Sequence, residues 1–121
     1  MTKIDFNLVA KCGGEPKSFK SGETIFREGD PADCLYVVRE GQVDITLGNR
    51  LLKPLGEGEI FGEMALIDGA PRSASAVARS DVTLIPVNEK QFAFLVGQLP
   101  YFALGVMRIM AERLRTMNSA L

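Results

Sequence analysis

Histidine and tryptophan are both absent from this chain of 121 residues, and cysteine occurs only twice. Without histidine there can be no Ser-His-Asp or Cys-His nucleophilic site, and the commonest metal ligand and general base are missing. Two cysteines without a Cys-x-x-Cys spacing make a poor metal site. We therefore expect Cys12 and Cys34 to be buried or half-buried thiols in a reducing compartment, and we expect no metal, no cofactor and no enzymatic centre.

Long hydrophobic runs are missing as well. No apolar stretch approaches the roughly 18 residues of a membrane span, and residues 1–14 lack the apolar centre of a signal peptide. Neither sign of charge dominates, because 14 basic residues stand against 15 acidic ones, whereas a nucleic-acid-binding domain is usually strongly basic. We expect a cytoplasmic protein with no membrane span and no nucleic-acid partner, folded as one domain over residues 1–121.

Glycine is frequent between residues 17 and 87, where short strand-like segments alternate with turns. Residues 42–47 alternate cleanly between apolar and polar side chains, which is typical of a strand with one buried face. Pro86 is expected to end the last strand of this region or to place it at a sheet edge. The fold class predicted is mainly β with flanking helices, an antiparallel jelly-roll β-barrel. Further strands are expected at residues 24–26, 35–38, 51–52 and 82–85.

Helices are expected on both sides of this β region, in residues 1–16 and 88–121. A short N-terminal helix over residues 3–11 would place Ile4 and Leu8 on one side. Asn88 can cap a helix that runs to about Gly97, and Pro100 suits the first turn of a final helix. Apolar residues recur along that final helix at steps of four and three, on one narrow stripe: Ala103, Met107, Met110, Leu114 and Met117. We expect this stripe to be a packing face or, where exposed, to serve a protein partner or self-association.

Residues 61–74 interrupt the strand pattern and carry the candidate chemistry. Gly62 precedes a predicted helical turn over residues 63–66, and such a turn can point backbone N–H groups at an anion. Arg72 follows ten positions later, and its guanidinium can hold two phosphate oxygens, with the Ser73 hydroxyl beside it. Glu63 would repel a phosphate, so it fits only if it faces another part of the ligand, such as a ribose hydroxyl.

Taken singly, these residues have simpler explanations. Arg72 can be a surface arginine after a proline turn, and Glu63 can be a carboxylate favoured by a helix N-terminus. The whole ordered segment is more specific. It resembles the phosphate-binding cassette of the cyclic nucleotide-binding domains, whose pattern is Phe-Gly-Glu, an aliphatic residue, Ala-Leu, a short spacer, Pro-Arg, a small residue and Ala. Gly41, Gly58 and the two closing helices extend the similarity over nearly the whole chain.

The resemblance implies a β-roll with a short cassette helix that binds cAMP or cGMP, as in bacterial regulators, kinase regulatory subunits, exchange factors and channels. It implies that Glu63 accepts a hydrogen bond from the ribose 2′-hydroxyl and that Arg72 pairs with the phosphate. Ser73 would donate to the phosphate or reach a purine edge, which leaves the choice between cAMP and cGMP open. The remaining cassette positions of the predicted site are Phe61, Gly62, Met64, Ala65 and Ala74, with the backbone N–H groups around Met64 and Ala65 holding phosphate oxygens.

Three residues outside the cassette complete the predicted site. Ile45 and Leu55 either form apolar walls for the purine or belong to the barrel core. Arg113 is either a solvated cation or a lid that covers the base, because a residue of the final helix often has that role in this family. The final helix would then close over the ligand.

The function expected is that of a non-catalytic cyclic nucleotide sensor. An excised sensor domain of a larger channel or kinase is the alternative, although Met1 and an end just after the final helix weakly favour a complete small protein. A jelly-roll enzyme of the cupin kind would need metal-binding histidines. A DNA-reading regulator is not expected, since the chain ends at Leu121 without room for a helix-turn-helix.

Overall fold

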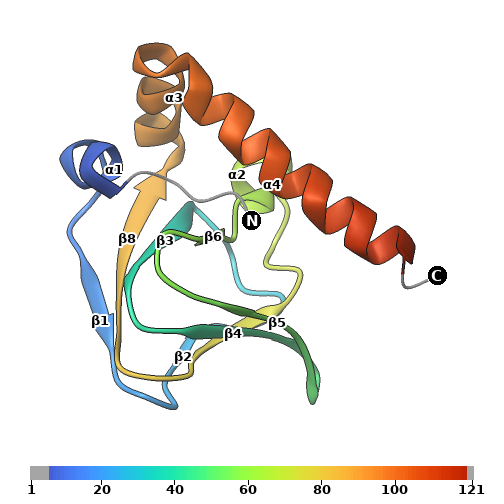
Figure 1. Ribbon diagram of the computed structural model, residues 1–121. Coiled ribbons are helices and arrows are strands. Elements are labelled where there is room, and N and C mark those ends of the chain that lie inside the picture. Colours follow the sequence, from blue (N-terminus) through green and yellow to red (C-terminus); the bar gives the residue numbers. More distant parts are fainter. Residues whose placement is uncertain (1–5, 120–121) are drawn as a thin grey trace.

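Two antiparallel four-stranded sheets stack on each other, and helices cover the outer face of one of them (Figure 1). The computed structural model describes residues 6–119. The first sheet has the order β1-β8-β3-β6 and the second has the order β2-β7-β4-β5. This confirms the predicted mainly β, jelly-roll-like class. The strands are β1 (Lys17–Phe19), β2 (Thr24–Phe26), β3 (Cys34–Glu40), β4 (Val43–Leu47), β5 (Arg50–Leu55), β6 (Ile60–Phe61), β7 (Ser75–Ala78) and β8 (Val82–Asn88).

Four helices accompany the sheets: α1 (Phe6–Cys12), α2 (Met64–Asp68), α3 (Glu89–Gln98) and α4 (Pro100–Ser119). The N-terminal helix ends one residue later than predicted, and Ile4 lies outside the described residues. Asn88 caps α3 as expected, because its side chain accepts from the Gln91 backbone N–H while the Gln91 side chain accepts from the Asn88 backbone N–H. Pro100 opens α4, also as expected.

The central strands of the first sheet, β3 and β8, are covered on both faces, which explains their nearly continuous apolar sequences. In β3 every residue from Cys34 to Val38 is buried. Alternate residues face two different clusters: Leu35 and Val37 pack under the helices, whereas Tyr36 and Val38 pack between the two sheets. A strand with both faces covered shows no alternation of apolar and polar side chains. We call the cluster between the sheets, which also holds Phe61, Leu55 and Leu84, the inter-sheet core.

Strand β8 continues through Pro86, so the expectation that this proline ends a strand is wrong. Pairing with β3 extends to Asn88, while pairing with β1 stops at Leu84. Beyond Leu84, the Pro86 carbonyl accepts from the Gly14 N–H. Pro86 therefore lacks its N–H on the side where β1 has already ended. No neighbouring strand requires a donor there, so the sheet tolerates a proline at this position.

Helix α4 packs mainly through residues outside the predicted stripe. Phe102, Val106 and Ile109 are buried in the cluster under the helices, and of the predicted stripe Met110 packs against the same cluster. Met107 and Leu114 are each 58% exposed. The stripe predicted for packing is therefore confirmed at Met110, whereas Met107 and Leu114 lie on the exposed side of the helix.

Helices α3 and α4 meet at a bend of 117°. The Leu99 N–H still bonds to the Leu95 carbonyl, and Pro100 then starts a new helix, since a proline has no N–H to continue the old one. No single described helix is long and apolar enough to cross a membrane. Among the described residues, the segments Glu89–Gln98 and Pro100–Thr116 reach the length and apolar composition of a span only when they are taken together, and this bend separates them.

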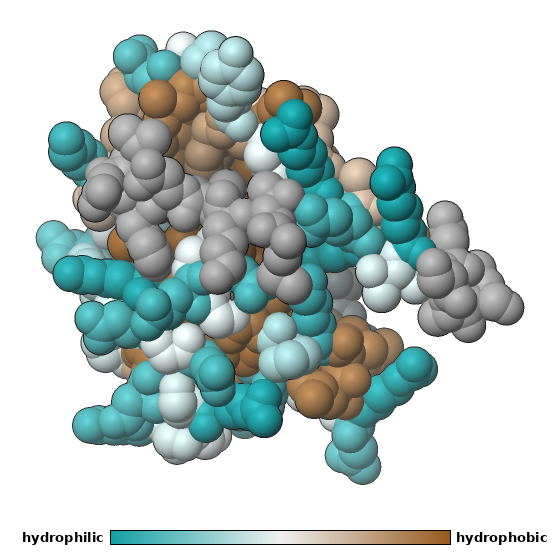
Figure 2. Space-filling view, viewed as in Figure 1, coloured by the Kyte–Doolittle hydropathy of each residue, from teal (hydrophilic) through white to brown (hydrophobic). Residues whose placement is uncertain are grey.

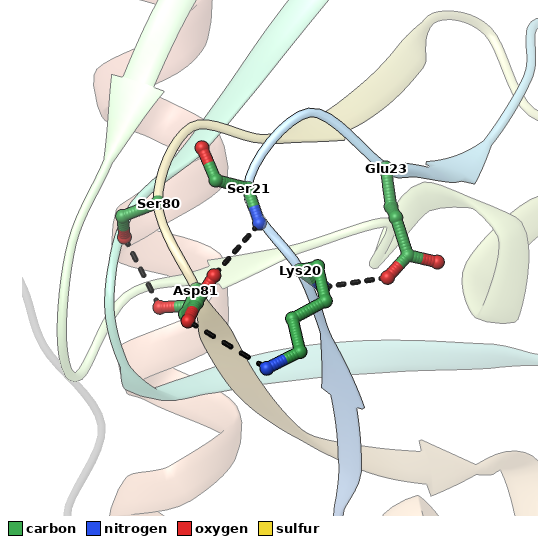
Figure 3. A network of polar contacts seen from close by, with 5 residues as sticks. All are labelled: Lys20, Ser21, Glu23, Ser80 and Asp81. Atoms are coloured by element: carbon green, nitrogen blue, oxygen red, sulfur yellow. Dashed lines mark hydrogen bonds and ion pairs between the residues drawn. The ribbon is translucent and has the colours of Figure 1, made fainter.

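Polar contacts hold the turn after β1 against the turn before β8 at the end of the barrel (Figure 3). The Ser21 N–H donates to the Asp81 carboxylate at 2.9 Å, and the Lys20 N–H donates to the Glu23 carboxylate at 2.7 Å. The Ser80 hydroxyl donates to the Asp81 carbonyl. These groups are exposed, so they fix the turns without forming a buried site.

A hydrophobic patch lies over the end of the β4–β5 hairpin in Figure 2. Leu47, Leu51 and Leu52 are exposed there, between 43% and 51%. Strand β5 is also an edge strand, and Lys53 and Pro54 within it discourage pairing with another strand.

Candidate functional site

The cassette forms the predicted turn and short helix between β6 and β7. Gly62 has φ +77°, in the left-handed region that favours glycine, and α2 begins two residues later. A Cβ at Gly62 would collide with the Arg72 guanidinium. The glycine is therefore needed twice, once for its backbone angle and once for the space that Arg72 occupies.

Arg72 is held in place by its own backbone and by two carbonyls. Its N–H donates to the Asp30 carbonyl at 2.9 Å, and its carbonyl accepts from the Gly29 N–H at 2.8 Å. Its guanidinium donates through Nη1 to the Gly62 carbonyl at 3.1 Å and through Nη2 to the Cys34 carbonyl at 2.8 Å. The cassette, β3 and the turn before β3 thus all meet at this one side chain.

The charge of Arg72 is buried and forms no ion pair within the part of the chain that the structure describes. The residue is 7% exposed, and its Nε is buried without a hydrogen-bond partner. No carboxylate among residues 6–119 lies within ion-pair distance of the guanidinium. Burial raises the pKa of the neighbouring Tyr36 phenol far above its ordinary value, and its hydrogen bond with Cys34 raises it further, so this phenol stays neutral. An unpaired buried cation is costly, and an anion bound here would compensate it.

Glu63 is also buried, at 1% exposure, but it is paired. Its carboxylate accepts from Nη1 of Arg113, and Nη2 of Arg113 donates to the Ile60 carbonyl at 2.6 Å. Arg113 stands on α4, and Glu63 lies in the cassette 50 residues earlier. This contact joins the final helix directly to the predicted ribose-reading residue.

The other predicted site residues fall into two groups. Met64 and Ser73 are exposed, and Ala74 is half-buried, so these residues border the surface beside Arg72. Phe61 and Leu55 belong to the inter-sheet core, and the half-buried Ile45 packs at its edge. The backbone of Ala65 lies within α2.

Two features of the site had no signal in the sequence pattern. Cys34 contributes its main-chain carbonyl to Arg72, a role that does not depend on side-chain type. The Phe26 ring lies 4.2 Å from the Arg72 guanidinium carbon, although the sequence suggested only a strand there. As for metals, no group of three or more potential ligands occurs among the described residues, and both cysteines are free.

Comparison with known proteins places these features in a family. Residues 16–98 match the model of the family described as "Cyclic nucleotide-binding domain". The "Cyclic AMP receptor protein" of Thermus thermophilus is 40% identical over 102 residues, which cover 80% of this chain and 47% of that protein. The chain spans about half the length of the curated bacterial relatives that it matches first.

Solved structures show the same fold. The crystal structure of Thermus thermophilus catabolite activator protein superimposes with a TM-score of 0.84 at 34% identity, covering 93% of this chain and 55% of that one. The cAMP-bound form of the EAL enzyme Bd1971 superimposes with a TM-score of 0.65 at 39% identity, covering 88% and 29% of the two chains.

Proposed function

Because the chain belongs to the cyclic nucleotide-binding domain family, we propose that it binds cAMP or cGMP at the site around Gly62, Glu63 and Arg72. The observation that carries this proposal is the buried Arg72, which has no anionic partner among the described residues. A phosphodiester supplies one negative charge and oxygen acceptors for the guanidinium. It would pair the cation in a site where water is largely excluded, so the interaction is stronger than at the surface.

A bound ribose would give a role to Glu63, the second buried charged residue of the site. Glu63 can accept a hydrogen bond from a 2′-hydroxyl, whereas it would repel a phosphate. Arg113 already donates to this carboxylate, so a bound ribose and α4 would meet at the same group. We propose that this shared carboxylate lets α4 respond to the ligand, through contacts that differ between the free and the bound protein.

We further propose that the protein is a sensor without catalytic activity. Bacterial relatives are named as a receptor and as a transcriptional regulator, and this chain has no histidine. The EAL enzyme shows that the family's domain also occurs within enzymes. Incubation of the purified protein with cAMP, followed by chromatography of the nucleotide, should return cAMP unchanged. Its conversion to AMP would contradict this proposal.

Calorimetric titration tests the binding itself. At least one of the two cyclic nucleotides should bind, and AMP should bind more weakly because its phosphate is a dianion facing one arginine. Arg72→Ala should weaken binding about thirtyfold or more, since loss of one partner of a buried charge pair costs about 2–5 kcal/mol. Arg50→Ala, at an exposed arginine of β5, is the matched control and should leave affinity unchanged. Equal binding of AMP and cAMP would contradict the assignment.

Self-association through α4 is a second part of the proposal. Leu104, Met107, Ala111 and Leu114 are exposed, and their spacing of three, four and three residues is that of a coiled-coil seam. A seam of this kind on one helix is self-complementary, so we propose a second copy of this chain as its partner. Met107→Glu should shift the protein to monomer in sedimentation, while Arg108→Glu, beside the seam, should not. Monomers in the unmodified protein would refute this.

A further inference from the structure

Three aromatic rings pack together next to Arg72 inside the barrel. Phe26 of β2, Tyr36 of β3 and Phe61 of β6 have ring centroids between 5.4 and 6.3 Å apart. The guanidinium carbon of Arg72 lies 4.2 Å from the centroid of Phe26 and 5.8 Å from that of Tyr36. Phe26 is thus the nearer of the two rings that the cation faces.

A β-bulge in β2 turns Phe26 toward this position. Thr24 pairs with Val77 and Phe26 pairs with Ala76, so β2 has one residue more than β7 across this stretch. In a regular strand Phe26 would share a face with the exposed Thr24. Instead Ile25 and Phe26 both pack against the inter-sheet core. Bulges of this kind re-aim side chains beside functional sites.

The guanidinium of Arg72 is therefore held in two ways. The Gly62 and Cys34 carbonyls fix its edge, and the Phe26 ring lies against it. The negative face of an aromatic ring stabilises a cation that has lost its water. An arginine ordered before the ligand arrives loses less rotamer freedom on binding than a mobile one.

We propose that Phe26 is a positioning residue of the nucleotide site, which acts through Arg72 by holding the guanidinium in the orientation that meets the phosphate. This inference rests on the proposed function, because ordering of the Arg72 guanidinium raises nucleotide affinity only if a phosphate binds to Arg72. A leucine at position 26 would keep much of the apolar volume but would supply no ring face.

Calorimetry with cAMP on Phe26→Leu tests the proposal. Phe19→Leu is the matched control, because Phe19 packs against the same core and no cation lies over its ring among the described residues. Phe26→Leu should weaken binding about five- to thirtyfold, the range for a cation–π contact that is largely desolvated. Phe19→Leu should not, and Phe26→Tyr should retain the affinity. In an Arg72→Ala background, Phe26→Leu should cause no further loss. Equal losses in both backgrounds would overturn the proposal.

A second readout needs no nucleotide. The ring of Phe26 should shift the NMR signal of the Arg72 Nε–H upfield and keep it sharp, in the unmodified protein and in Phe19→Leu. In Phe26→Leu the signal should move and broaden. An unchanged signal there would show that Phe26 does not order Arg72, and would overturn the proposal whatever the affinity. Absence of cAMP binding by the unmodified protein would instead refute the proposed function, and with it the phosphate part of this inference alone.

Discussion

Replacing Arg113 by alanine removes the cation that joins α4 to the cassette. The Arg113 guanidinium bonds at once to the Glu63 carboxylate and to the Ile60 carbonyl. Glu63 is 1% exposed, so it cannot recover the lost partner from water without movement. We therefore expect Arg113→Ala to release the second half of α4 from the barrel, even in the absence of nucleotide.

The size of the effect follows from burial. Breaking a fully buried ion pair costs about 3–5 kcal/mol, because the remaining charge is left unpaired. The Arg113 side chain is 30% exposed, which lowers the cost, so we expect about 2 kcal/mol. That corresponds to roughly a thirtyfold increase in the equilibrium constant for opening of the helix. Phe102, Val106 and Ile109 still anchor the first half of α4, so the opening should be confined to the part after Ile109.

Hydrogen exchange followed by mass spectrometry measures this directly. Peptides covering residues 110–116 should exchange faster in Arg113→Ala, while those of β3 should not change. Arg108→Ala is the control, since Arg108 is exposed on the same helix. Equal exchange in both variants would refute the reasoning. So would an Arg113→Ala effect that persists undiminished in a Glu63→Gln background, because the ion pair would then not be its cause.

Three further changes test other parts of the site. Glu63→Gln should weaken cAMP binding by about 1–2 kcal/mol in calorimetry but hardly affect 2′-deoxy-cAMP, which lacks the hydroxyl donor; equal losses would exclude ribose recognition. Gly62→Ala and Gly48→Ala should each destabilise the protein by about 1–2 kcal/mol in urea unfolding, because both glycines have positive φ. Only the first should weaken cAMP binding, since only there would a Cβ meet Arg72; similar affinities would contradict this. Because the pKa of the Tyr36 phenol is raised in the folded protein, the unfolded chain loses this proton first above about pH 10, and the free energy of unfolding then falls by about 1.4 kcal/mol per pH unit. Urea unfolding of Tyr36→Phe should therefore show a shallower alkaline loss, and an equally steep one would argue against the buried phenol.

Elements determined by local chemistry were predictable from the sequence. The alternation at residues 42–47 predicts β4 because a half-buried strand needs it, and Asn88 and Pro100 predict two helix starts because capping and proline geometry act over a few residues. The cassette turn was predictable for the same reason, since Gly62 and the helical turn after it are adjacent. Strand β6, with two residues, is too short to leave a periodic pattern.

Features determined by distant partners were not predictable in this way. Helix α4 has apolar residues on two faces, and helical periodicity cannot tell which one the barrel covers. The pairing of Glu63 with Arg113 and the support of Arg72 by Cys34 join residues 50 and 38 positions apart. Each depends on how the sheets and helices come together, so no spacing within the chain encodes it.

The charges of the assembled site lead us to expect that it prefers a cyclic nucleotide to a linear one. Arg72 and Arg113 are cationic and Glu63 is anionic, so these three groups together carry one net positive charge. We expect the single charge of a phosphodiester to bring the site to neutrality, while a phosphate dianion would leave one buried negative charge in excess. Because Glu63 already neutralises Arg113, the ligand charge is directed to Arg72. We therefore expect the ion pair to separate two tasks: it would keep α4 attached to the cassette, and it would leave Arg72 as the group that pairs with the phosphate.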